Sequence, residues 1–202
     1  MSNANFFILH LSLIEKVGPS PIQRIIDRIN DICPDDWYRF TDADFMRLGI
    51  TQLAASRIVQ GLQNQKLLDK ELDLIESANA SWVTLLDPEY PYLLKNIHLP
   101  PPVLYWKGRL PQGQNQIAVV GSRDANQYGF DAVRRIAGPL AVHEWGIISG
   151  GAAGIDAMAH KVALDNGAYT AAVLGSGLLN LYPRENFRLF DDILAHHGAL
   201  IS

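Results

Sequence analysis

Three apolar runs decide the fold of this chain, and each ends in a turn that contains glycine: Ile-Ala-Val-Val-Gly-Ser-Arg at 117–123, Gly-Ile-Ile-Ser-Gly-Gly-Ala-Ala-Gly-Ile-Asp at 146–156, and Thr-Ala-Ala-Val-Leu-Gly-Ser-Gly-Leu at 170–178. A segment with a helix-like pattern follows each run. Short continuous apolar runs that alternate with amphipathic segments are typical of a parallel sheet whose strands are covered on both faces by crossover helices. The sequence therefore predicts three βα units in an open parallel α/β sheet.

Apolar residues recur at helical spacing after the first two runs, which predicts a crossover helix in each place. They are Phe130, Val133, Ile136, Ala137 and Leu140 after the first run, and Ile155, Met158, Ala159, Val162 and Ala163 after the second. In an open α/β sheet the strand ends with their turns lie on one edge, together with the helix N-termini, and ligands bind there. Free N–H groups and the positive end of a helix dipole favour an anion at this edge. We therefore expect the backbone of these turns to bind phosphate.

Glycine after a strand also has a structural explanation, because the chain must turn with positive φ or pass close to a helix. Three such turns in register favour a phosphate-bearing ligand instead. The second turn has the pattern G-G-x-x-G at 150–154, whereas a dinucleotide site carries G-x-G-x-x-G, and no acidic residue clearly ends the second strand to hold a ribose. The sequence therefore predicts no nicotinamide cofactor, and no other cofactor is expected.

The glycine turns belong to a longer series of motifs that resembles the DprA/Smf family of DNA-processing proteins. Motifs upstream of the first run resemble the entry into that family's Rossmann-like domain, and the family's order of motifs is kept. The residues that carry the resemblance are Gly121-Ser122-Arg123; Ser149-Gly150-Gly151-Ala152-Ala153-Gly154-Ile155-Asp156 with Ala159-His160; Leu174-Gly175-Ser176-Gly177-Leu178 with Tyr182-Pro183 and Glu185-Asn186; and, upstream, Tyr90-Pro91, Leu94, Ile97, Pro100-Pro101-Pro102-Val103-Leu104-Tyr105 and Lys107-Gly108.

The resemblance implies a Rossmann-like open parallel sheet at residues 81–202, preceded at residues 1–80 by a small all-helical, SAM-like module. It further implies a non-enzymatic, cytoplasmic protein that binds single-stranded DNA, protects incoming DNA and helps to load a RecA-type recombinase during natural transformation. A homodimer is implied for the full-length protein. Two departures from the family are visible. Ala153 stands where Lys or Arg is common, and the chain ends where the family's Rossmann-like domain continues, so we expect a chain truncated on its C-terminal side.

Arg123 is the first candidate for a side-chain contact with DNA, because it follows the first strand directly and its guanidinium group can donate two hydrogen bonds to one phosphate. Arg184 or Arg188 would supply a second basic contact after the third turn. Each of these arginines could instead form a salt bridge within the protein. The hydroxyl groups of Ser122 and Ser176 could bind phosphate or cap a helix. The complete set of expected DNA- and phosphate-binding residues is Gly121, Ser122, Arg123, Gly150, Gly151, Gly154, Gly175, Ser176, Gly177, Arg184, Asn186 and Arg188.

Asp156 and His160 lie four residues apart on one predicted helix, a spacing that would also suit a catalytic pair. No nucleophile pattern such as G-x-S-x-G accompanies them, so no catalytic residue is predicted. We expect Asp156 to cap or orient the helix and His160 to be a hydrogen-bonded, partly buried histidine. Two rival functions stay open: a phosphoribohydrolase-like enzyme, although residues 149–156 lack the Thr and Glu of its P-G-G-x-G-T-x-x-E turn, and a sensor of small nucleotides.

Composition excludes several other classes of protein. With 202 residues, 48% of them hydrophobic, and a net charge of −4, the chain can bury a core but carries no excess of basic residues, so DNA must bind in a local pocket. The single cysteine, Cys33, permits no internal disulfide, and no Cys/His spacing predicts a metal site. The apolar start at residues 6–11 is too short to span a bilayer and is expected to be a buried helix, so no membrane partner is predicted.

Residues 5–80 show helical patterns without strand-like alternation and predict four or five short helices broken at prolines. Gly18 and Gly49 resemble the hairpin glycines of helix-hairpin-helix units, whose turn amides contact DNA phosphate. A compact module in which these glycines only make tight turns is the alternative. The basic residues that could assist a DNA contact are Arg47, Arg57 and Lys66.

Residues 81–114 form a proline-rich transition with one strand candidate at 103–106. Aromatic side chains in this transition could stack on the bases of single-stranded DNA, but packing in a core is their commoner role. These side chains are Trp82, Tyr90, Tyr92, Tyr105 and Trp106.

Overall fold

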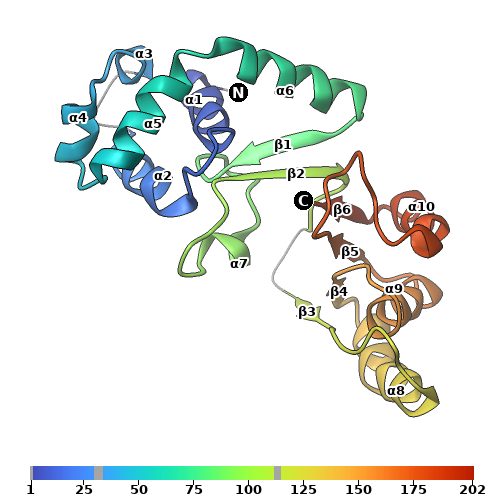
Figure 1. Cartoon of the computed structure of the whole chain (residues 1–202). Coiled ribbons are helices and arrows are strands. Elements are labelled where there is room, and N and C mark those ends of the chain that lie inside the picture. Colours follow the sequence, from blue (N-terminus) through green and yellow to red (C-terminus); the bar gives the residue numbers. More distant parts are fainter. Residues whose placement is uncertain (1, 30–33, 112–114) are drawn as a thin grey trace. The chain divides into compact units, whose positions relative to one another are not determined.

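The computed structural model describes residues 2–29, 34–111 and 115–202 (Figure 1). Cys33, on which the expectation of no internal disulfide rests, lies outside these residues. Contacts divide the chain into two units, Met1–Ser77 with Trp82–Leu104 and Ala78–Ser81 with Tyr105–Ser202. The division passes through two strands, whereas the domain boundary near residue 80 stays a prediction.

The first unit is mainly helical, and its first helix carries the apolar run at residues 6–11. Phe7, Ile8, Leu9 and Leu11 are fully buried, so this run packs in the core, as the sequence predicts. Six helices precede the first strand in the described residues, one more than the upper prediction, and the shortest is a single turn. The helices are α1 (Asn3–Ser12), α2 (Pro19–Ile26), α3 (Pro34–Trp37), α4 (Asp42–Arg47), α5 (Gln52–Leu62), α6 (Gln65–Ser77) and, after the first strand, α7 (Tyr92–Lys95).

Gly49 makes the tight turn between α4 and α5 with a φ of 78°. Its carbonyl oxygen accepts a hydrogen bond of 2.8 Å from the guanidinium group of Arg24, which lies against the glycine. A Cβ at this position would collide with that guanidinium group, so packing within the module is enough to require glycine here. A contact between this module and DNA stays a prediction.

Two of the aromatic side chains considered for base stacking pack inside the first unit. Trp82 is buried, and its ring lies edge-on to Phe6 with the ring centroids 5.5 Å apart. Tyr90 is also buried, and its hydroxyl donates a hydrogen bond of 2.8 Å to the carbonyl oxygen of Pro101. Both side chains therefore pack in the core, whereas Tyr92 is exposed.

A six-stranded sheet has the order β1-β2-β6-β5-β4-β3. Strands β3, β4, β5 and β6 run parallel, which confirms the predicted parallel sheet, and β2 pairs with β6 in the antiparallel direction with Trp106 opposite Ile201. The sequence analysis missed β1, because four residues are too few to show an alternating pattern. The strands are β1 (Ser81–Thr84), β2 (Val103–Gly108), β3 (Gln116–Ala118), β4 (Gly146–Ser149), β5 (Thr170–Val173) and β6 (Ala199–Ile201).

Three crossover helices connect the parallel strands: α8 (Gln127–Val142), α9 (Ile155–Asp165) and α10 (Phe187–Ala195), which follows the short 3-10 helix η2 (Arg184–Asn186). All three lie on one face of the sheet, since α9 shares one apolar core with α8 and β4 and another with α10, β5 and β6. The predicted crossover helices are therefore present, and they cover one face of the sheet. Strands β3 to β6 follow one another in sequence order, so crossovers of one hand place every helix on the same side.

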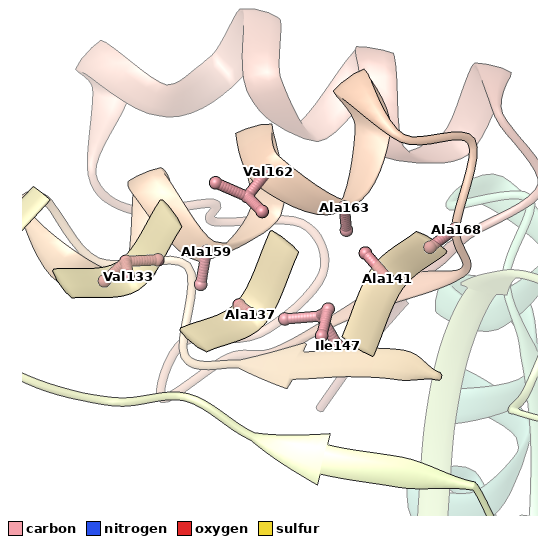
Figure 2. Packing of buried hydrophobic residues seen from close by; sticks show 8 residues of the cluster. All are labelled: Val133, Ala137, Ala141, Ile147, Ala159, Val162, Ala163 and Ala168. Carbon is pink, nitrogen blue, oxygen red and sulfur yellow. The ribbon is translucent and has the colours of Figure 1, made fainter. Parts of the chain in front are cut away.

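The core between α8, α9 and β4 consists mostly of small side chains (Figure 2). Ile147 from β4 lies against Ala137 and Ala141 of α8 and Ala163 of α9, which allows both helices to approach the strand closely. The buried face of α8 is narrower than the spacing predicts, because Ile136 is 64% exposed. This packing fixes the N-terminus of α9 and the turns beside it.

Candidate nucleic-acid interface

A pocket of about 320 Å³ lies at the carboxyl ends of β3, β4 and β5, within the second unit. The three glycine turns of the sequence all contribute to it, so the structure brings them together as the topology of an open α/β sheet requires. A fourth segment, between the third turn and α10, completes the wall. The lining residues are Arg123 after β3; Gly150, Ala152 and Ala153 after β4; Gly175 and Ser176 after β5; and Tyr182, Pro183 and Glu185 from the fourth segment.

Gly154 joins the first and second turns. It has a φ of 75°, and a Cβ there would collide with the carbonyl oxygen of Ser122 and lie 2.7 Å from that of Arg123. The next amide, that of Ile155 at the start of α9, donates a hydrogen bond of 3.1 Å to the Ser122 carbonyl oxygen. Glycine is therefore required both by the backbone angle and by the close approach of the two turns. This contact fixes the backbone of Arg123 beside the second turn.

Hydrogen bonds from two side chains hold the other segments together. The Ser149 hydroxyl at the end of β4 donates to the carbonyl oxygen of Val119 at 2.6 Å. The side-chain amide of Asn186 donates to the carbonyl oxygens of Gly151 and Ala152 at 2.9 and 3.1 Å, and Asn186 is buried. Asn186 was expected to contact DNA, but its donors are used inside the protein. We therefore assign it a positioning role for the second turn.

Asp156 uses its carboxylate to orient the second turn. Its Oδ2 accepts a long hydrogen bond of 3.3 Å from the amide of Ala152, and the residue is buried. This agrees with the expected structural role and removes one of the amides that phosphate could use. Within residues 2–29, 34–111 and 115–202, no acceptor lies opposite the remaining amides of the second and third turns: Gly150, Gly151, Ala153, Gly154, Gly175, Ser176 and Gly177.

Arg123 and Glu185 place opposite charges in the pocket, and neither forms an ion pair or side-chain hydrogen bond in the described part of the chain. The guanidinium group is therefore not engaged by another described side chain, and its contact with an anion stays a prediction. The hydroxyl oxygen of Ser176 is buried and has no partner among the described residues. A buried hydroxyl without a partner is costly, so a ligand oxygen that paired with it would be favoured.

The remaining expected residues lie around the pocket rather than in its wall. Gly121 passes so close to Ile155 that a Cβ would lie 2.8 Å from its side chain. The Ser122 hydroxyl accepts a hydrogen bond of 3.1 Å from the amide of Asp124, and Gly177 accepts one of 2.9 Å from that of Asn180. Arg184 and Arg188 are both exposed, and neither lines the pocket.

His160 is a core histidine, as expected, with its ring fully buried. Its Nδ1 lies 2.7 Å from the Thr170 hydroxyl, whose single hydrogen is donated to the carbonyl oxygen of Ile147 at 2.7 Å. The Nδ1–H of His160 therefore donates to Thr170, and burial lowers the pKa of the imidazole to about 4. A neutral, fully buried ring is not available to act on a ligand.

Tyr182, Pro183 and Glu185 line the pocket but were not among the expected binding residues. They formed part of the motifs that carry the family resemblance, yet nothing in their spacing showed that the segment folds back against the second turn. The buried Asn186 was the available signal, because a polar residue followed by the apolar face of a helix is often anchored to backbone.

In the described part of the chain, no three His, Cys, Asp or Glu side chains come together in a group that could hold a metal ion. Nor does any helix there combine the length and the apolar character needed to cross a membrane.

Comparison with known proteins adds to this geometry. The sequence model of the family described as DNA recombination-mediator protein A matches residues 81–202, which is more than half of the chain and includes the whole pocket. The chain belongs to this family. The resemblance to the DprA/Smf family is thereby confirmed. The protein Smf of Synechocystis is 33% identical over 199 residues, which cover 95% of this chain and 48% of the relative. The chain thus spans about half the length of that member of the family.

Solved structures of the family share the fold. DNA processing protein A from Streptococcus pneumoniae aligns with all of this chain at a TM-score of 0.76 and 25% identity, and 67% of that protein is covered. DNA processing protein A from Helicobacter pylori, whose structure is described as showing a single-stranded DNA binding mode, aligns with 62% of this chain at a TM-score of 0.51 and 27% identity, with 56% of that protein covered.

Proposed function

We propose that the pocket binds the backbone of single-stranded DNA and that the protein acts as a non-enzymatic recombination mediator. One observation carries this proposal: Arg123, without an ion-pair partner in the described part of the chain, shares the pocket with free amide groups of the second and third turns. Amide donors bind phosphate without raising the net charge, which suits a chain of charge −4. Family membership and the DNA-binding mode described for the Helicobacter pylori protein support the same function.

The size of the pocket limits how much of a strand it takes. Its volume of about 320 Å³ is near the lower end of small-ligand sites, which begin at about 300 Å³. It would hold roughly one nucleotide, with a phosphate against Arg123 and the amides of Gly150, Ala153 and Gly175. Neighbouring nucleotides would lie outside the pocket, where the exposed Arg184 and Arg188 follow the third turn.

An Arg123→Ala substitution tests directly whether the DNA strand lies in this pocket. We expect it to weaken binding of an oligo-dT strand at least about tenfold, the effect of losing one charge-assisted hydrogen-bonded contact of about 1.4 kcal/mol. Arg135→Ala removes the same charge from an exposed position on α8 that does not line the pocket, and should change affinity less than about twofold. Fluorescence anisotropy measures both. An Arg123→Ala variant that binds within twofold of the unmodified protein would show that the strand lies elsewhere.

The rival functions make different predictions for mononucleotides. A phosphoribohydrolase-like enzyme releases adenine from AMP, whereas a DNA-binding protein leaves AMP intact. A nucleotide sensor binds mononucleotides as well as it binds oligomers. The structure gives no support to a catalytic Asp156–His160 pair, because both side chains are buried and hydrogen-bonded inside the protein.

We also propose that the protein protects incoming single strands in the cytoplasm and helps to load a RecA-type recombinase, and that the full-length protein forms a homodimer. Family membership supports these roles. Adding the protein to a strand already coated with single-strand-binding protein should increase the ATPase activity of the recombinase on that strand. The Arg123→Ala variant should lose this stimulation in proportion to its loss of DNA affinity. Equal stimulation by both proteins would contradict a loading role through this pocket.

A further inference from the structure

Glu185 is not explained by phosphate binding. Glu185 lines the same pocket as Arg123, and a carboxylate near a phosphate is repelled by it. Glu185 is exposed, and in the described part of the chain no basic side chain forms an ion pair with it. The two charges of the pocket do not pair with each other either. A ligand that suits both must be anionic at one end and rich in N–H donors at the other.

Tyr182 is not explained by phosphate binding either. It contributes to the same wall of the pocket as Glu185, yet 68% of its surface is exposed. An aromatic ring left open beside a DNA backbone is the usual platform on which a base stacks. The fourth segment therefore offers a flat apolar surface and an acceptor within a few residues, opposite the turns that carry the backbone donors.

We propose that Tyr182 and Glu185 form a nucleobase subsite of the DNA-binding pocket, and that this subsite prefers guanine. The inference rests on the proposed function, since it assigns the base of the same nucleotide whose phosphate lies on Arg123. The base stacks on the Tyr182 ring, and the Glu185 carboxylate accepts hydrogen bonds from its Watson–Crick edge. The nucleotide then satisfies both charges of the pocket at once.

The hydrogen-bonding chemistry of the Glu185 carboxylate sets the preference for guanine. An ionised carboxylate only accepts hydrogen bonds and has two oxygens, so it pairs best with two adjacent donors. Guanine presents N1–H and the N2 amino group side by side. Thymine presents one N–H between two carbonyl oxygens, which repel a carboxylate, and adenine and cytosine each present an amino group beside a ring nitrogen that is itself an acceptor. Guanine is thus the DNA base that matches Glu185 with two bonds.

The test compares an oligo-dT nonamer with the same strand carrying one central dG, by competition in fluorescence anisotropy. We expect the dG strand to bind at least about fivefold more tightly, the lower limit for a good bidentate contact to a base. Replacing dG by deoxyinosine removes only the N2 amino group and should remove most of the preference. Glu185→Gln should bring the ratio of the two affinities close to one, whereas Glu144→Gln, at an exposed position outside the pocket, should keep the ratio.

Two substitutions at Tyr182 test whether the base stacks on its ring. Tyr182→Ala should weaken both strands about fivefold or more, because base–aromatic stacking does not depend on the base, and Tyr182→Phe should keep the affinity for both. Loss of affinity in both variants would assign the effect to the hydroxyl group and contradict stacking.

Three results would overturn the proposal. Equal binding of the dG and dT strands by the unmodified protein is the first. The second is a Glu185→Gln variant that binds every strand more tightly by one factor, which would show that Glu185 only repels phosphate. The third is a dG preference abolished by EDTA, which would place a metal ion between Glu185 and the strand. If Arg123→Ala leaves oligo-dT affinity unchanged, the proposed function itself fails. If that variant weakens binding but no dG preference exists, only the base subsite fails.

Discussion

The side-chain nitrogen of Asn186 lies 2.9 Å from the carbonyl oxygen of Gly151 and donates a hydrogen bond to it. The two residues belong to different turns of the sheet edge, thirty-five positions apart along the chain. Because both are buried, water cannot replace the bond if it is lost. This single contact sets the distance between the segment that carries Tyr182 and Glu185 and the turn that offers its amides.

Replacing Asn186 should therefore loosen the site. Asn186→Ala removes the hydrogen bonds to Gly151 and Ala152 and leaves the buried carbonyl oxygen of Gly151 without a donor, whereas that of Ala152 still accepts from the amide of Ala157. We therefore expect the free energy of unfolding to fall by about 1–3 kcal/mol. Urea unfolding measures the loss, and hydrogen exchange should show faster amide exchange at residues 150–156. Asn180→Ala, at an exposed asparagine of the same segment, is the control and should change neither quantity. Unchanged exchange in the Asn186 variant would contradict the positioning role.

The glycines of the turns should differ sharply in their tolerance of alanine. Gly154→Ala imposes a positive φ on a residue with a side chain and drives its Cβ into the backbone of the first turn, so we expect a loss of roughly 2 kcal/mol or more. At Gly175 a Cβ meets no atom within 4 Å, and φ is not positive, so Gly175→Ala should leave stability within about 0.5 kcal/mol. Thermal unfolding of both variants checks the contrast. Equal losses would mean that the close approach at Gly154 is not needed.

Acid should destabilise the protein through His160. Burial lowers the pKa of this side chain from 6.5 to about 4, so between these values the unfolded chain binds a proton that the folded protein excludes. The stabilising contribution is complete above pH 6.5 and is lost as the pH falls to about 4, with a total of roughly 3 kcal/mol. Urea midpoints measured between pH 6.5 and about 4 give the slope of stability against pH.

Variants assign that slope to a residue. His160→Asn keeps a donor near Thr170 without a titratable ring, and should give a shallower dependence of stability on pH than the unmodified protein, whatever its absolute stability. The buried His10, whose pKa burial also lowers, should leave a residual slope of the same sign. His98→Asn, at an exposed position, is the control. An unchanged slope in His160→Asn would show that the ring is not the source.

Salt should weaken DNA binding only modestly. Each phosphate of a single strand that is neutralised by a cationic side chain adds about −0.7 to the slope of log K against log salt concentration. With Arg123 as the cation of the pocket and Arg184 or Arg188 nearby, we expect a slope of about −1 to −2, and Arg123→Ala should reduce its magnitude by about 0.7. Anisotropy titrations at several salt concentrations measure it. A slope steeper than about −4 would indicate a broad basic surface in place of a pocket.

The parallel strands and the edge at which the turns meet could be predicted because both follow from local pattern. Continuous apolar runs such as Gly146–Ser149 have to be buried strands, and helical spacing after them requires crossovers, so the carboxyl ends must share one edge. The strand candidate at 103–106 is found as β2, but its antiparallel pairing with β6 and the short β1 could not be predicted in the same way. Pairing between Trp106 and Ile201 joins distant parts of the chain and leaves no local signal.

Within the site, too, residue roles that follow from residue type could be predicted, whereas roles that depend on contacts between distant segments could not. Arg123 and the glycines could be proposed as binding residues because residue type alone limits what they can do: a guanidinium group binds anions, and glycine permits positive φ. Asn186 was assigned to DNA and instead holds the second turn, since a side-chain amide serves a ligand or the backbone equally well. Tyr182 and Glu185 were overlooked as binding residues because nothing near them in sequence shows that they line the pocket.

The sequence by itself determined that the three glycine turns meet at one sheet edge, because apolar periodicity and glycine placement are local properties that burial and backbone sterics translate directly into strands and turns. Only the tertiary structure decided which donors remain free there. The amide of Ala152 pairs with Asp156, the side chain of Asn186 pairs with Gly151, and Arg123 keeps no partner in the described part of the chain. Those outcomes depend on distances between segments far apart in the chain, which only packing of the helices on the sheet can set.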